Sequence, residues 1–192
     1  MTLVSRTRRL NHMQRISGLS CLLTFIVSDH FNPRTAAALH YERPALRFGC
    51  CEWMVKPLLS AGVNRRSIDV YTPDLLYEYQ GICTLTPQPL THCVPNCGYH
   101  ITDLEQSRMF YATDTATMDG IEAKGYDLYM IEANHVKAEL EARRDAKVAA
   151  GEYAYEFNAA RNHMSQEQAE DWLYQQMGPN SRYVFLHQHS PK

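Results

Sequence analysis

The sequence has little of several features that mark specialised classes of protein. Its 192 residues include nine Gly and nine Pro, too few for a collagen-like or low-complexity chain, and its 10% aromatic content excludes general disorder. No apolar run approaches the roughly 20 residues that a transmembrane helix needs, so we expect no membrane-spanning segment. The net charge is only −2, whereas domains that hold nucleic acid by bulk charge are strongly basic. The sequence lacks the Gly-rich phosphate-binding motifs and the G-x-S-x-G nucleophile motif.

The six cysteines could form disulfides if the chain were secreted. Four arginines precede the apolar residues 19–27, which resembles the start of a signal peptide, but no small-residue cleavage site follows. The adjacent pair Cys50 and Cys51 is also a poor candidate for bridging to itself. We therefore expect a reduced protein in the cytoplasm.

The order of the expected secondary structure favours an α/β or α+β fold, and the length favours one globular domain. Short runs rich in β-formers alternate with helical patterns, and Asn32-Pro33 and Ser165 to Gln168 are typical helix starts. Helices are expected at residues 34–41, 52–61, 135–150 and 165–177. Strands are expected at residues 21–27, 46–48, 68–71, 81–86, 89–94, 99–103, 108–113, 128–131 and 181–187.

Nine His is a high number for this length, and several of them follow the expected strands. Polar residues at strand ends are where layered α/β proteins usually place a site. Alone, each would be an ordinary surface histidine or turn aspartate, but together they form a set of nitrogen and oxygen donors suited to Zn²⁺ or a similar ion. The set comprises Asp29, His30, His92, Asp114, His187 and His189.

With these segments in order along the chain, the sequence resembles the metallo-β-lactamase-fold hydrolases, in particular small phage and bacterial members related to phosphodiesterases and RNA-processing nucleases. Tyr111-Ala-Thr-Asp114-Thr115 resembles the segment with the metal-bridging aspartate, and residues 125–134 resemble the next strand with its glutamate, Glu132. Residues 91–99 are similar to the segment with the third histidine ligand, His92. Asn162-His163-Met164-Ser165 and residues 184–189 resemble the two late histidine elements.

The resemblance implies an αββα sandwich over residues 28–192, preceded by a non-matching segment at residues 1–27. It also implies roles for individual residues. Asp29 would bind metal and orient the nucleophile, and His163 would donate a proton or contact the phosphate while Glu132 fixes its ring. Asp29, His30, Asp114 and a terminal histidine would form one metal position. Either His187 or His189 could be that ligand; we prefer His189 slightly because Ser190 follows it.

The first motif of the family, T-H-x-H-x-D-H, is changed in this chain. The aligned residues are Thr24 to His30, and Phe25 and Val27 stand where two histidine ligands are expected. Neither side chain can bind a metal. The other metal position would keep only His92 and Asp114, so we expect a single ion, Zn²⁺ or Mn²⁺. The expected first sheet is incomplete, which either a shifted reading frame or true degeneration would produce.

The activity implied by the resemblance is metal-dependent hydrolysis of a phosphodiester in a nucleotide or nucleic acid. The alternative is a catalytically inactive fold remnant or interaction protein that retains one metal site, because two ligands are missing. An incomplete sheet would leave strand edges exposed, so a homodimer is a further expectation.

Three other patterns could indicate binding sites, but each of them is a weaker signal than the donor set above. Cys93 and Cys97, with His92 and His100, have the spacing of half a zinc knuckle, but a second pair at finger spacing is missing. The Tyr-rich residues 71–79 could stack on nucleobases, although a half-buried rim is the simpler interpretation. Residues 137–147 carry charges of both signs and indicate an exposed helix face with i,i+4 pairs.

Overall fold

The computed structural model describes residues 8–9, 23–25 and 31–188 of the chain. These residues divide into two compact units, residues 1–87 and 88–192, and each unit is described by itself. No helix in the described part of the chain is both long enough and apolar enough to cross a bilayer. The expected boundary near residue 28 falls at the edge of residues outside the described set and remains a prediction.

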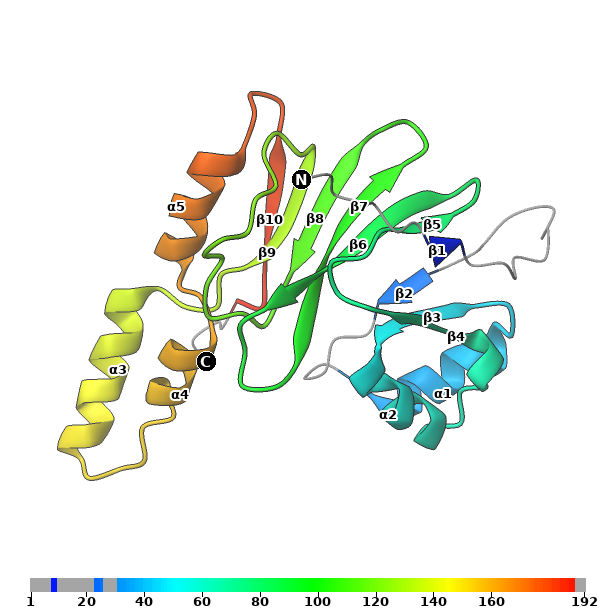
Figure 1. Ribbon diagram of the computed structural model, residues 1–192. Coiled ribbons are helices and arrows are strands. Elements are labelled where there is room, and N and C mark those ends of the chain that lie inside the picture. Colours follow the sequence, from blue (N-terminus) through cyan, green and yellow to red (C-terminus); the bar gives the residue numbers. More distant parts are fainter. Residues whose placement is uncertain (1–7, 10–22, 26–30, 189–192) are drawn as a thin grey trace, which may run out of the picture. The chain divides into compact units, whose positions relative to one another are not determined.

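The first unit contains a parallel sheet in the order β2-β3-β4, formed by β2 (Leu23–Phe25), β3 (Arg47–Cys51) and β4 (Ile68–Tyr71). Helices α1 (Pro33–Glu42) and α2 (Val55–Ser60) accompany it, with short 3₁₀ turns at Glu52–Met54 and Arg65–Ser67 (Figure 1). Asn32 caps α1 by accepting a hydrogen bond from the Thr35 amide, which confirms the expected helix start. The core of this unit includes Phe48, Leu58 and Ile68.

Three tyrosines near the end of the first unit are buried, so the expected half-buried rim at residues 71–79 is wrong. Tyr71, Tyr77 and Tyr79 are at most 3% exposed, which leaves none of them for stacking on nucleobases. Two of them belong to β5 (Tyr77–Tyr79), a strand that the sequence did not predict, which pairs with β6 (Cys83–Leu90) in an antiparallel hairpin and with β1 (Arg8–Arg9) in parallel. One strand, β6, replaces the two expected at 81–86 and 89–94.

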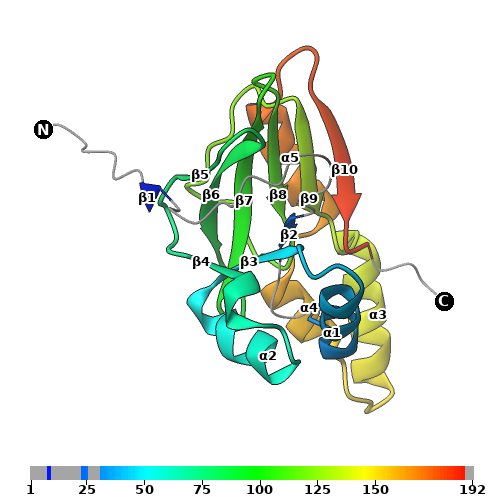
Figure 2. The same cartoon turned by 90° about the vertical axis from the view of Figure 1, so that its right-hand side faces the viewer.

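The second unit is built on the strand order β7-β8-β9-β10 (Figures 1 and 2). β7 (Asn96–Asp103) and β8 (Arg108–Ala112) are antiparallel, whereas β9 (Leu128–Glu132) runs parallel to both β8 and β10 (Arg182–Leu186). The carboxyl ends of β8, β9 and β10 therefore meet at one edge of the sheet. Asp114, Glu132 and His187 stand at those ends.

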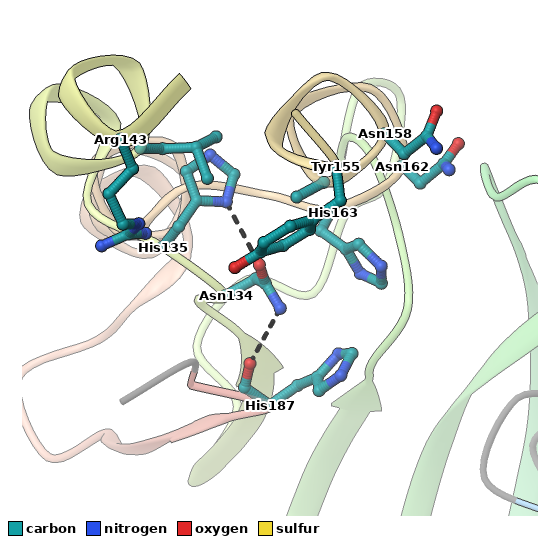
Figure 3. Close-up of a pocket in the computed structure, with 10 residues that line it drawn as sticks. Asn134, His135, Arg143, Tyr155, Asn158, Asn162, His163 and His187 are labelled. Carbon is teal, nitrogen blue, oxygen red and sulfur yellow. Dashed lines mark hydrogen bonds between the residues drawn. The ribbon is translucent and has the colours of Figure 1, made fainter. Parts of the chain in front are cut away.

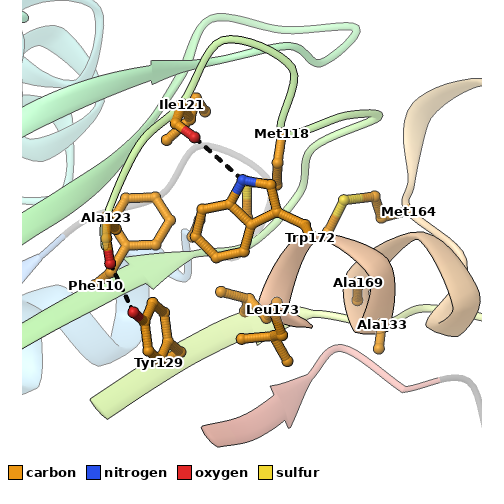
Figure 4. Packing of buried hydrophobic residues seen from close by; sticks show 12 residues of the cluster. Phe110, Met118, Ile121, Ala123, Tyr129, Ala133, Met164, Ala169, Trp172 and Leu173 are labelled. Atoms are coloured by element: carbon orange, nitrogen blue, oxygen red, sulfur yellow. Dashed lines mark hydrogen bonds between the residues drawn. The ribbon is translucent and has the colours of Figure 1, made fainter. Parts of the chain in front are cut away.

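Helix α5 (Gln166–Gln176) packs on this sheet and forms the larger core. Its residues Trp172 and Leu173 contact Phe110 of β8 and Tyr129 of β9, and the Trp172 indole donates a hydrogen bond to the Ile121 carbonyl (Figure 4). The expected capping box is present: the Ser165 hydroxyl accepts from the Gln168 amide, and the Gln168 side chain accepts from the Ser165 amide. This cap fixes where the segment containing His163 enters the helix.

Two further helices, α3 (Lys137–Ala149) and α4 (Glu156–Asn162), pack against each other after β9. The sequence predicted α3 but not α4. Its expected i,i+4 pairing is present between Arg143 and Glu139 (3.6 Å), but Lys147 instead bonds the buried Glu156 at the start of α4 (2.7 Å). The helix face is therefore only partly a solvated surface. Helices and sheets in both units confirm the mixed α/β class.

Candidate metal centre

Four side chains that could bind a metal meet at the carboxyl edge of the second sheet. Potential ligand atoms of Asp114, Glu132, His163 and His187 all lie within 4.8 Å of one another. Both carboxylates are buried, and the two imidazoles are half-buried. Among the described residues this is the only group of three or more such side chains, so the alternative zinc knuckle around Cys93 and Cys97 is not formed.

Glu132 organises the cluster. Its Oε1 accepts hydrogen bonds from Nδ1 of His163 (2.7 Å) and Nδ1 of His187 (2.9 Å), and its Oε2 accepts from the Thr115 amide (2.8 Å). Its side chain is fully buried at the end of β9. Burial raises the pKa of Glu132, but the hydrogen bonds from the two histidines outweigh it and lower the pKa overall. The carboxylate is therefore ionised and fixes both rings.

Asp114 and His187 adopt backbone conformations that side chains rarely take. Their φ angles are +55° and +54°, in the left-handed region, where Asp and His are tolerated better than most residues. The Asn96 amide holds the Asp114 turn by donating to the Thr113 and Asp114 carbonyls (2.8 and 2.9 Å). A left-handed conformation costs free energy in a residue other than glycine, so it persists only where the surrounding structure holds it. Such residues are often found at functional sites.

His187 lies just beyond the last strand. The sequence predicted a strand through His187, but β10 ends at Leu186 and the chain turns at His187. Nδ1 of His187 lies 3.0 Å from Oδ1 of Asp114. Its hydrogen bonds to Asp114 and Glu132 raise the pKa of His187 to about 10. His189 lies outside the described residues, so the preference for it as the terminal ligand remains a prediction.

The other candidate residues fall outside this group. His92 donates from Nδ1 to the Asn162 carbonyl (3.0 Å), and its ring packs against that of His163 with 5.0 Å between centroids. It therefore lies beside the cluster without joining the four ligand groups. Asp29, His30 and Val27 lie outside the described residues, and of Phe25 only the backbone is described, at the end of β2.

Several residues near the cluster were not predicted from the sequence. The Asn96 side chain supports the Asp114 turn, and the Thr115 amide donates to Glu132. Only the fold reveals these two contacts. Asn134 and His135 follow the end of β9 after one intervening residue, so their place after a strand could have indicated them. Both line a cavity beside His163 and His187, together with residues of α3 and α4 (Figure 3).

The donor set fits a divalent metal ion. Two carboxylates and two imidazoles are the ligand types that Zn²⁺ and Mn²⁺ accept, and glutamate bonded to the second nitrogen of a histidine is the usual support for a metal ligand or a catalytic ring. A further carboxylate or histidine could complete such a set. The described residues can therefore hold one metal ion at this edge.

Comparison with known proteins identifies the architecture. No protein-family model and no curated protein sequence matches the chain. Among solved structures, the metallo-β-lactamase-fold protein YhfI of Bacillus subtilis superposes with a TM-score of 0.61 at 13% identity, covering 86% of this chain and 64% of that one. Human tRNase Z, short form, gives a TM-score of 0.56 at 12% identity, covering 86% of this chain and 71% of that one.

Zn²⁺-bound PqqB from Methylobacterium extorquens gives a TM-score of 0.53 at 12% identity, covering 79% of this chain and 57% of that one. This chain thus spans less than two thirds of YhfI and of PqqB. Identities this low show the fold alone. The likeness confirms the fold expected from the ordered segments between Asp114 and His187: the chain has the metallo-β-lactamase fold.

Proposed function

We propose that the protein is a metal-dependent hydrolase that acts on a phosphodiester in a nucleotide or a nucleic acid. The observation that carries the proposal is the shared carboxylate of Glu132, which binds His163 and His187 beside Asp114. Such an arrangement combines metal ligands with a proton-carrying histidine in one buried cluster. Human tRNase Z, whose name states action on a nucleic acid, shares the fold and supports the choice of substrate.

In this proposal one ion, Zn²⁺ or Mn²⁺, is held by Asp29, His30, Asp114 and one terminal histidine. His187 lies in the described cluster, and His189 is the alternative for that terminal position. The metal supplies Lewis-acid activation of water and of the phosphoryl oxygens when it is bound. A single ion follows from Phe25 and Val27, which have no donor atoms where the family has two histidines. The Zn²⁺-bound state of PqqB supports zinc as the first choice.

The chain's own residues handle the protons. Glu132 holds Nδ1 of His163, so the opposite ring nitrogen, Nε2, is the atom that donates a proton to the leaving-group oxygen. Asp29 orients the attacking water. The His92 ring packs against the His163 ring at an interplanar angle of 58° and limits the space into which that ring can move.

The test measures metal content and turnover on the same protein. We expect about one Zn²⁺ per chain and metal-dependent hydrolysis of bis(p-nitrophenyl) phosphate, both abolished by Asp114→Asn. Asp119→Asn, an exposed carboxylate five residues away, is the matched control and keeps both. Two tightly bound ions would overturn the single-metal assignment, and the absence of any metal-dependent rate would overturn the hydrolase.

The alternative function, an inactive fold remnant or interaction protein with one metal site, is favoured by the loss of the two first-motif ligands at Phe25 and Val27. It predicts metal binding without turnover, so the same experiment separates the two functions. A homodimer and a cytoplasmic location are further parts of the proposal. Size-exclusion chromatography with light scattering tests the first of them.

A further inference from the structure

A cavity of about 230 Å³ opens beside the candidate metal centre (Figure 3). His163 and His187 of the centre contribute to its wall, and the rest comes from the turn after β9 and from α3 and α4. The proposed hydrolysis uses the two histidines but none of the other lining residues. Those that matter here are Asn134, Arg143, Tyr155, Asn158 and Asn162.

The polar groups of this wall suit a flat ring with both donors and acceptors on its edge. Three asparagine side chains line the cavity, and an amide can both donate and accept. The Asn134 side chain already bonds the His187 carbonyl and the His135 ring, so Asn158 and Asn162 are the two that matter for a ligand. The backbone carbonyl of Asn162 accepts from His92, so the side chain of Asn162 is not used in that bond. Nδ2 of Asn158 donates to the Tyr153 hydroxyl (3.0 Å). The side-chain oxygen of Asn158 still offers an acceptor.

Arg143 supplies a cationic donor on the same wall. Its Nε is buried and has no hydrogen-bond partner among the described atoms, although a guanidinium nitrogen lies 3.6 Å from Glu139. A buried N–H without a partner is costly, and a ligand acceptor would remove that cost. Glu139 and the buried Glu156 offset part of the charge, so Arg143 favours a hydrogen-bonding ligand over a bare anion.

Tyr155 supplies an aromatic surface. Tyr155 is 38% exposed as a residue, and the Lys147 ammonium lies 4.1 Å from the centroid of the Tyr155 ring. An aromatic ring at the wall of a polar cavity is the usual platform on which a nucleobase stacks. Apolar parts of Leu140 and Ala159 complete the wall.

The size selects a single unit of substrate. Pockets for drug-sized ligands usually measure about 300–1,000 Å³, so a 230 Å³ cavity limits its ligand to no more than one nucleoside. Resting on the proposed hydrolase function, we propose that this cavity holds the nucleoside adjoining the scissile phosphate of a nucleotide substrate, with its base against Tyr155 and its polar edge bonded to Arg143 and Asn162.

The test measures binding without metal. Titration of the EDTA-treated protein with adenosine 5′-monophosphate, followed by NMR or calorimetry, is compared with titration by inorganic phosphate. We expect the nucleotide to bind about tenfold more tightly than phosphate, because base stacking adds to the contact. Equal affinity for the two would overturn the proposal.

Two variant pairs locate the site. Arg143→Gln is matched with Arg144→Gln, because the two side chains are 31% and 32% exposed and only Arg143 lines the cavity. Tyr155→Leu is matched with Tyr174→Leu, a tyrosine that is 91% exposed on α5. We expect about tenfold weaker nucleotide binding for the first of each pair and a change within twofold for the second. Equal effects within either pair would overturn the site, and thermal unfolding of all four variants excludes loss of fold as the cause.

The source of the nucleoside is decided by a further titration with a single-stranded RNA hexamer. Tighter binding than the monophosphate, with the same variant sensitivity, identifies the end of an RNA strand as the source, and equal or weaker binding identifies a free nucleotide. The outcome is separable from that of the proposed function. Nucleotide binding in EDTA reports on the cavity alone, whereas turnover of bis(p-nitrophenyl) phosphate, which has no nucleoside, reports on the metal centre alone.

Discussion

Each unit buries carboxylates among strands, and the groups around them differ. In the first unit, Asp69 of β4 is paired with the Arg47 guanidinium and accepts from the Tyr79 hydroxyl (3.0 Å), which in turn bonds the Tyr71 hydroxyl. In the second unit, Asp114 and Glu132 are surrounded by two imidazoles. Arginine is always protonated, and burial raises the pKa values of Tyr71 and Tyr79 well above their usual range.

The comparison separates a structural network from a chemical one. The protons of the first network stay in place throughout the physiological pH range, so Asp69 can only hold strands together. The imidazole nitrogens of the second network can exchange a hydrogen bond for a metal ion, which an arginine guanidinium cannot do. Buried charge alone is therefore a poor marker of a site, and the identity of the partner groups decides.

The largest effect is expected from Glu132→Gln. The substitution replaces one acceptor oxygen by an N–H₂ group, which would face either the Thr115 amide or the Nδ1 atoms of His163 and His187. Metal-dependent turnover should fall by about 100-fold or more, as measured with bis(p-nitrophenyl) phosphate. Asp69→Asn in the other network is the matched control. The turnover rate of Asp69→Asn per folded molecule should stay within twofold of the wild-type rate. A comparable loss of turnover in both variants would contradict the distinction between the two networks.

A stability test addresses the first network. A Cβ at Gly49 would overlap the ring and hydroxyl of Tyr71 on the neighbouring strand. Gly49→Ala should therefore lower the free energy of unfolding by about 2–3 kcal/mol, measured by urea denaturation. Gly178→Ala meets its nearest atom, Cα of Gly125, at an ordinary 3.6 Å and serves as the control. Equal stabilities of the two variants would contradict the tight packing at Tyr71.

Much of the second unit could be predicted from local sequence, because its signals are local. Asp114 and Glu132 follow runs of β-formers, and parallel strands bring such ends together. The Ser165 capping box needs only four residues to be recognised. These signals predict that Asp114 and Glu132 lie at the same edge of the sheet, which is where the structure has them.

The features that were not predicted depend on tertiary contacts that a local sequence pattern does not contain. Tyr77 and Tyr79 have the sequence of a half-polar loop, but both are buried, and their hydroxyls bond the Thr72 amide and Asp69. Helix α4 has a weak pattern of its own and depends on the bond between Glu156 and Lys147 of α3. The turn at His187 likewise follows from its carboxylate partners, which the strand pattern of residues 181–187 does not contain.

A smaller effect, on stability, is expected from removing the cap of α5 at Ser165, two residues after His163. Ser165 is 2% exposed and caps α5, so Ser165→Ala should cost about 1 kcal/mol of stability. Ser60→Ala, at an exposed helix end in the first unit, should change stability by less than half of that. Urea denaturation measures both, and an unchanged midpoint for Ser165→Ala would show that the cap is dispensable.

The smallest effect is expected from Glu156→Gln, and it should depend on pH. Burial raises the pKa of Glu156, but the bond from Lys147 outweighs it, so the pKa in the folded protein lies below its ordinary value of 4.5. A lowered folded pKa stabilises the fold above the unfolded pKa, and this contribution is lost as the pH falls through the folded value. The variant should therefore be less stable than the wild type at pH 7, by less than Ser165→Ala, and the difference should shrink below pH 4.5. Urea denaturation from pH 7 to pH 3, with the exposed Glu152→Gln as control, measures it, and a difference independent of pH would contradict the ion pair.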